Sequence, residues 1–73
     1  INLYTVESNI SKQLGLIQKK YKKFVDIGSY PFFRLGKIGV AIVTRSNSIS
    51  KLNIVNKELF RLVKFKKIQI LKI

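Results

Sequence analysis

The sequence contains no cysteine and no histidine, and only 3 of its 73 residues are acidic. Without cysteine, neither a disulfide framework nor a thiolate metal site is available. Without histidine, the commonest general base and transition-metal ligand is missing. Because Glu7, Asp26 and Glu58 are the only carboxylates, most hydrolytic and metal-dependent reactions lack their functional groups. We therefore expect a protein that is not an enzyme, with no catalytic residue, no cofactor and no metal site.

Long apolar runs are also missing. No segment approaches the roughly 20 consecutive apolar residues that a membrane-spanning helix needs, and no signal-peptide pattern is present. We therefore expect a cytoplasmic protein without a membrane partner. The length of 73 residues suits one small domain, and a hydrophobic fraction of 47% is enough for a packed core.

Basic residues dominate the charge. The chain has 15 Lys and Arg against 3 Asp and Glu, a formal net charge of +12. Such an excess can attract nucleic acid, anionic membranes or acidic ligands. The alternative is a bias of composition, because 12 of the 15 basic residues are lysine and the chain also contains 11 Ile and 5 Asn. A genome rich in A and T codons produces that combination, so both explanations stay open.

Hydrophobic patterning divides the chain into strands and helices. β-branched and aromatic runs predict strands, and apolar spacings of three and four predict helices. The predicted elements are a strand over 2–6, a helix over 9–22, a strand over 24–27, a strand over 37–45, a helix after Ser50 and a strand over 68–73. This β-α-β-β-α-β order predicts an α+β, ferredoxin-like sandwich, with a four-stranded antiparallel sheet and two helices on one face. Residues 1–73 are expected to form one domain.

Both predicted helices carry an apolar stripe. The first follows an expected N-cap at Ser8 and has its stripe at spacings of four, three and four: Ile10, Leu14, Ile17 and Tyr21. The second has a similar set: Leu52, Val55, Leu59, Leu62 and Val63. Such stripes face a core, so these side chains are predicted to pack against the sheet.

The stretch Asp26–Lys37 is predicted to be a loop between the second and third strands. It holds the only proline and two of the four glycines. Gly28 permits backbone angles that other residues avoid, and Pro31 forces the preceding residue toward an extended conformation. Three cations could converge on a phosphate or carboxylate, with Ser29 and loop amides as donors: Arg34, Lys37 and Arg45. Solvated cations beside a hydrophobic loop are the alternative.

Two further patterns concern nucleic acid. Gly36-Lys37-Ile38-Gly39 matches the GXXG of KH domains, but it precedes a predicted strand instead of joining two helices. An RNA-recognition motif would carry stacking aromatics on its third strand, whereas residues 38–43 contain none. The pattern therefore favours a simple turn and argues against RNA binding by the sheet.

Several segments resemble a region of the competence/damage-inducible protein A (CinA) family. They are Glu7-Ser8-Asn9-Ile10, Leu14, Val25-Asp26-Ile27-Gly28-Ser29-Tyr30-Pro31 and Gly39-Val40-Ala41-Ile42-Val43-Thr44-Arg45-Ser46. Related molybdopterin-binding-like proteins, including the domain fused to some FAD synthetases, share this region. In the CinA family it looks like a small KH-type α/β module that follows the molybdopterin-binding-like domain. Its most specific part is Gly28-Ser29-Tyr30-Pro31.

The resemblance implies a non-catalytic accessory module of a CinA-type protein, and a C-terminal fragment of a larger chain. Such a module would pack on, or close over, a nucleotide site in a molybdopterin-binding-like domain or in a second protomer. The candidate ligand- or partner-binding residues are Gly28, Ser29, Tyr30, Pro31, Arg34, Lys37 and Arg45. The alternative hypothesis, a small basic nucleic-acid-binding domain, rests on the charge of +12 and the KH-type label.

Overall fold

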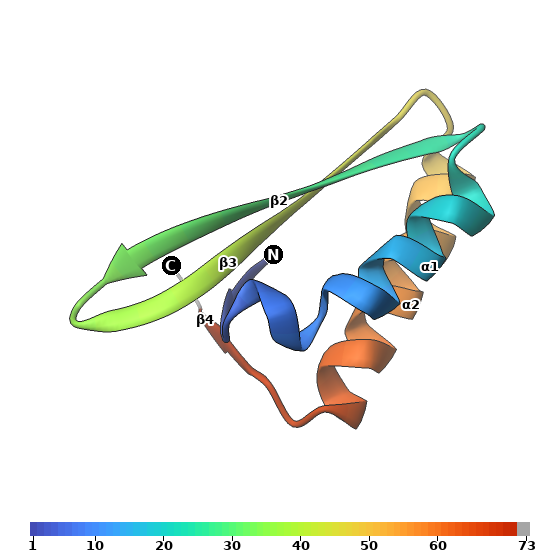
Figure 1. Cartoon of the computed structure of the whole chain (residues 1–73). Coiled ribbons are helices and arrows are strands. Elements are labelled where there is room, and N and C mark those ends of the chain that lie inside the picture. Colours follow the sequence, from blue (N-terminus) through green and yellow to red (C-terminus); the bar gives the residue numbers. More distant parts are fainter. Residues whose placement is uncertain (72–73) are drawn as a thin grey trace.

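The computed structural model describes residues 1–71 and contains four strands, two α-helices and one 3-10 helix in that range. In chain order they are β1 (Asn2–Tyr4), η1 (Glu7–Asn9), α1 (Ser11–Tyr21), β2 (Val25–Arg34), β3 (Lys37–Ser46), α2 (Ile49–Phe65) and β4 (Gln69–Leu71). Both α-helices lie on the same face of the sheet (Figure 1).

The strands form one sheet in the order β2-β3-β1-β4, and every neighbouring pair is antiparallel. Each α-helix connects two strands that are not neighbours, which leaves room between them for a strand of the other β-α-β unit. This arrangement confirms the predicted fold class, a four-stranded antiparallel sheet with two helices on one face.

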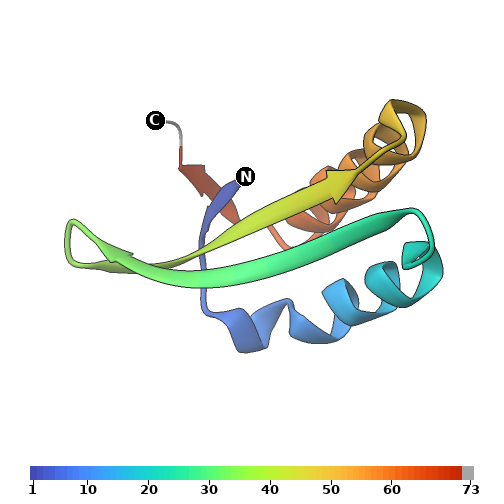
Figure 2. The same ribbon diagram turned by 90° about the horizontal axis from the view of Figure 1, so that it is seen from above.

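The β2–β3 hairpin is much longer than the other strands. Its partners run from Val25 opposite Ser46 to Arg34 opposite Lys37, and only the turn Leu35–Gly36 separates the two strands. β1 pairs with β3 only at Val40 and Ala41. The outer part of the hairpin therefore projects as an arm beyond both helices (Figures 1 and 2).

The predicted loop over residues 26–37 is wrong, because β2 continues through Gly28 and Pro31 to Arg34. Aromatic residues have high strand propensity, and Tyr30, Phe32 and Phe33 supply it here. Glycine and proline are tolerated because of where they lie in the sheet, as the site geometry below shows.

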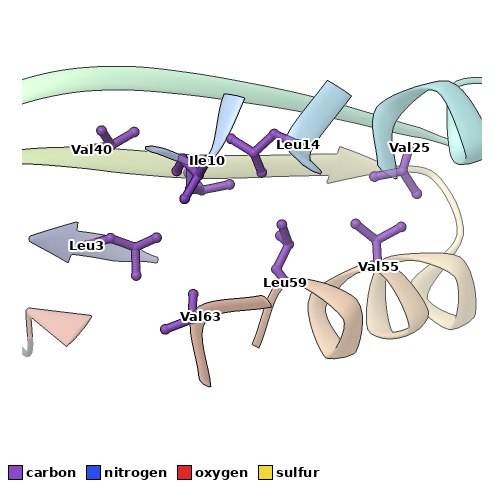
Figure 3. Packing of buried hydrophobic residues seen from close by; sticks show 9 residues of the cluster. Leu3, Ile10, Leu14, Val25, Val40, Val55, Leu59 and Val63 are labelled. Atoms are coloured by element: carbon purple, nitrogen blue, oxygen red, sulfur yellow. The ribbon is translucent and has the colours of Figure 1, made fainter. Parts of the chain in front are cut away.

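The core lies between the sheet and the two helices. Nine apolar side chains are buried there: Leu3, Ile10, Leu14, Val25, Val40, Ile42, Val55, Leu59 and Val63. Figure 3 shows the α2 side chains pointing toward those of the strands and of α1. The predicted stripes are confirmed, since their remaining members are partly buried against the same cluster: Ile17, Tyr21, Leu52 and Leu62.

The ends of several elements differ from the prediction. Ser8 lies within η1, and α1 starts after Ile10 without a side-chain cap. α2 starts after Ser48, whose Oγ accepts a hydrogen bond from the backbone N–H of Lys51 at 3.3 Å. The N-cap residue immediately precedes the first helical residue, and its side chain binds an amide two or three residues further on. Ser48 has this position, whereas Ser50, after which the helix was predicted to start, already lies in the first turn of α2.

The outer strands are short. β1 ends at Tyr4 and β4 covers Gln69–Leu71; the last two residues of the predicted final strand, 72–73, lie outside the described residues. Within residues 1–71, neither the length nor the apolar character of any helix is sufficient for crossing a membrane.

Candidate functional site

The sheet has one face without a helix on it, called the open face below. Residues opposite each other in an antiparallel pair share a face. Val40 and Ile42 are buried under the helices, so their neighbours on β3 and the partners of those neighbours point the other way. The middle of the open face therefore includes Asn2, Tyr4, Gly28, Tyr30, Phe32, Gly39, Ala41 and Val43.

Two aromatic rings on the open face cover two glycines. A Cβ built on Gly39 would overlap the ring of Phe32, its partner across the strands, with 2.6 Å to Cε1. A Cβ built on Gly28 would lie 2.9 Å from Cε2 and the hydroxyl of Tyr30. Rings that pack over strand glycines restore contacts that the missing side chains would have made. Gly28 and Gly39 therefore belong to a strand because aromatic residues lie above them.

A shallow depression of about 260 Å³ adjoins Phe32 on this face, and its lining is mostly apolar. Phe32, Ala41 and Leu71 contribute the apolar walls, and Arg34 lies at the rim. Nearby, the Lys37 Nζ lies 5.0 Å from the centre of the Tyr4 ring, within cation–π range. The open face is thus aromatic in its middle and basic at its edge.

The free edge of β2 is blocked at two places. Gln18 of α1 donates its Nε2–H to the carbonyl of Val25 at 2.9 Å, and its Oε1 accepts from the N–H of Ile27 at 2.6 Å. The Ile27 N–H thus points away from β3, and every second residue repeats that direction. Pro31 falls on such a position, where a missing N–H costs no hydrogen bond in the sheet. A side-chain clamp and a proline are devices that prevent another strand from adding at an edge.

The hairpin tip, defined as Phe33, Leu35 and Ile38, is apolar and exposed. Their exposed fractions are 73%, 83% and 56%. Leu35 and Gly36 have φ angles of 53° and 75°, as a two-residue type I′ turn requires. Glycine or asparagine usually occupies the first of these positions, because a branched side chain at positive φ is strained. Gly36 is therefore part of a hairpin turn, and the GXXG pattern forms no helix-joining loop.

The seven candidate residues do not form one cluster. Gly28, Ser29, Tyr30 and Pro31 lie in the middle of β2, whereas Arg34 and Lys37 face each other beside the turn. Arg45 lies opposite Asp26 at the other end of the hairpin. Eight residues of strand separate Arg45 from Lys37, roughly 26 Å at about 3.3 Å per residue. The three cations therefore do not converge on one anion, and the binding role of the seven residues stays a prediction.

A cleft between α1 and β2 was missed by the sequence analysis. It has a volume of about 240 Å³, and its lining is mostly apolar, from Leu14, Gly15 and Ile27, with polar groups contributed by Glu7, Ser11, Gln18 and Ser29. The Ser29 hydroxyl donates to Glu7 Oε1 at 3.3 Å. Gly15 also lines the cleft, and a Cβ there would meet no atom within 4 Å. The only sequence signal for this space is a glycine inside a helical pattern.

An ion pair lies where α1 meets α2. Lys20 Nζ lies 3.5 Å from Glu58 Oε1, and the charge of that carboxylate raises the pKa of Lys20. Hydrogen bonding to the same carboxylate raises the pKa of Tyr21. Among residues 1–71, no three side chains of the His, Cys, Asp and Glu types come close enough to bind a metal ion together.

The comparisons with known proteins point to a family other than the CinA family, which the sequence resembles. The family model described as FAD synthase, middle domain, matches residues 1–72. Searches of curated proteins and of solved structures found no match.

The family match corrects three expectations. The assignment to the CinA family is wrong, and so are the role as an accessory module of a molybdopterin-binding-like protein and the KH-type label. The alternative of nucleic-acid binding gains no support. The physical reason is that Gly28, Ser29 and Pro31 have structural tasks in the hairpin, so a pattern made of them cannot separate families that share such a hairpin. Because the match covers nearly the whole chain, the protein belongs to the FAD synthase middle domain family.

Proposed function

We propose that this chain is a non-catalytic connecting domain of a FAD synthase, and that its hairpin tip docks on a neighbouring domain of that enzyme. The observation that carries the proposal is the projecting arm with three exposed apolar side chains at its end. The family description, a middle domain, supports a position between other parts of the enzyme. The cytoplasmic location expected from the sequence is part of this proposal.

The chemistry of the tip suits a protein partner. An exposed group of large apolar side chains is typical of an interaction surface, and Phe33 and Leu35 are the most exposed large apolar residues of the arm. Leu35 also keeps a strained φ of 53°, where asparagine would fold with less strain. A residue that adopts a strained backbone conformation supports the hypothesis that its side chain has a function. Because Gln18 and Pro31 block the β2 edge, we propose docking through side chains and not through strand addition.

The placement of the acidic residues supports the non-catalytic part of the proposal. Glu7 lies on η1, Asp26 on β2 and Glu58 on α2. Glu7 accepts a hydrogen bond from Ser29, and Glu58 is paired with Lys20. Paired carboxylates for acid–base chemistry have to face a common substrate, and these three face different surroundings.

The test measures binding of the purified chain to the separately expressed remainder of the FAD synthase by titration calorimetry. The hairpin variant combines Phe33→Thr with Leu35→Asn, which preserves strand and turn preferences. The control combines Leu16→Gln with Phe65→Gln, two apolar residues on the helices with exposed fractions of 62% and 84%. We expect at least a tenfold loss of affinity in the hairpin variant and none in the control.

Three outcomes would contradict the proposal. Equal affinities of the hairpin and control variants would remove the tip as the docking surface. Self-association of the chain in sedimentation, lost in the hairpin variant, would replace the neighbouring domain with a second copy. FAD formation by the purified chain alone would refute the non-catalytic role.

A further inference from the structure

The end of the molecule opposite the hairpin tip carries two adjoining cavities. Their volumes are about 350 and 300 Å³. Both are lined by Lys22, Lys23 and Phe24, the segment that connects α1 to β2. Phe24 is 53% exposed, so an aromatic ring stands between two basic hollows.

Cations from three elements surround this segment, and they are called the basic end: Lys19, Lys20, Lys22, Lys23, Arg45 and Lys51. Lys51 of α2 places its Nζ 4.8 Å from the centre of the Phe24 ring. Among residues 1–71, Lys20 alone in this group has a carboxylate partner, Glu58. Among the residues that line the larger cavity, Asp26 is the acidic one. The basic end therefore holds an excess of positive charge without matching protein anions.

The helix dipole explains only part of this cluster. Cations are favoured in the last turn of a helix, which accounts for Lys19 and Lys20 of α1. The same effect disfavours Lys51, which lies in the first turn of α2. Lys19, Lys22 and Lys23 also line the same cavity, where like charges repel. Arg45 comes from β3 and adds to that repulsion. A bound anion would relieve the electrostatic cost that the fold leaves here.

We propose that the basic end binds a ligand with two or more linked phosphate groups, which spans the two cavities across Lys22 and Lys23. Lysine ammonium groups neutralise phosphate as point charges, and Arg45 can donate two parallel hydrogen bonds to it. The exposed Phe24 ring offers an apolar wall on which the base of a nucleotide could stack. These residues are distinct from the hairpin tip, so the inference is independent of the proposed connecting role.

The test is a calorimetric titration of the folded chain with inorganic tripolyphosphate, pyrophosphate and orthophosphate. The site variant combines Lys22→Gln with Lys23→Gln. The control combines Lys57→Gln with Lys64→Gln, two exposed lysines of α2 that line neither cavity. Both variants lose two charges, so a general electrostatic effect is the same in each. We expect tripolyphosphate to bind the wild type and the control similarly, and the site variant at least tenfold more weakly.

A second titration with ADP identifies the source of the phosphates. Tighter binding of ADP than of pyrophosphate, abolished by Phe24→Ala, assigns a nucleotide; equal binding assigns an inorganic polyphosphate. Three results would overturn the proposal. The first is no tripolyphosphate binding by the wild type with a Kd on the order of 100 µM or tighter. The second is equal losses in the two lysine variants, and the third is orthophosphate binding as tight as tripolyphosphate. Circular dichroism of each variant verifies that its fold is intact.

Discussion

Replacing Gly39 with alanine should be more damaging than the same change at Gly28 or Gly15. A Cβ at this position would overlap the Phe32 ring and would lie 2.7 Å from the backbone oxygen of Leu3. The ring can rotate away, but Leu3 is held by its pairing with both Val40 and Ile70. Overpacking of this kind costs about 1–3 kcal/mol. In a domain of this size each kcal/mol corresponds to about 4–8 °C in Tm, so the loss should be readily measured.

Two other glycines provide controls on the same reasoning. Alanine at position 28 would meet only the outer atoms of the Tyr30 ring, at 2.9 Å, and a flexible side chain can move, so we expect a loss of less than about 1 kcal/mol. Alanine at position 15 would meet nothing within 4 Å. Because glycine inside a helix is less favourable than alanine by about 0.5–1 kcal/mol, Gly15→Ala should stabilise the chain.

The measurement is urea unfolding of all three variants followed by far-ultraviolet circular dichroism. The expected order of stability is Gly15→Ala, wild type, Gly28→Ala and Gly39→Ala. If Gly39→Ala were as stable as Gly28→Ala, the β1 carbonyl would not constrain the hairpin, and the close approach of Leu3 to Gly39 would have to be abandoned. A destabilised Gly15→Ala would show that the space beside α1 is filled.

Three further substitutions test the turn, the edge and the ion pair. Leu35→Asn should raise stability by about 1 kcal/mol, because asparagine tolerates positive φ; an unchanged Tm would show that the turn stores no strain. Gln18→Ala should cost about 1–3 kcal/mol, because it leaves a backbone donor and an acceptor of β2 unpaired; a loss below the error of unfolding measurements would refute the clamp. Glu58 raises the pKa of Lys20, mainly by its charge, and that of Tyr21, mainly by hydrogen bonding. Both groups therefore keep their protons to higher pH in the folded chain than in the unfolded chain. This stabilisation is complete below about pH 10 and is lost as the pH rises through the folded-state pKa values. Glu58→Gln should flatten that loss, and equal slopes of Tm against pH above 10 would contradict it.

The helices and the core could be predicted from the sequence because they depend on local periodicity. Val55, Leu59 and Val63 recur at spacings of four along α2, and all three are buried. Such a stripe needs no knowledge of its partner surface, because any core would accept it. The β-α-β-β-α-β order then limits the topology to very few arrangements, and the observed strand order is among them.

The hairpin could not be predicted because each of its unusual residues depends on a distant neighbour. Gly28 and Gly39 lie in strands because Tyr30 and Phe32 cover them, and a local reading of glycine favours a loop. Pro31 is tolerated in β2 because its backbone nitrogen, which carries no hydrogen, points away from β3. The hydrogen bond from the Ile27 N–H to Gln18 reveals this direction. Strand propensity depends on tertiary context in just this way.

The candidate site followed the same error. A loop over 26–37 would have let Arg34 approach Arg45, whereas the continuous hairpin holds Arg45 at the opposite end from Arg34 and Lys37. The cleft beside Ser29 was missed for a related reason. Its lining comes from η1, α1 and β2, and no local pattern connects Glu7 with Gln18 and Ser29.

The long hairpin also separates the two proposed binding surfaces. Its turn presents Leu35 to one side of the molecule, and its other end holds Arg45 among the cations around Phe24. With ten residues in each strand, these ends lie roughly 30 Å apart at about 3.3 Å per residue. That distance exceeds the screening length of about 8 Å at physiological ionic strength, so charge at the basic end cannot steer a partner to the tip. Substitutions at one surface should therefore leave binding at the other unchanged, and coupling between them would require that the hairpin itself bends.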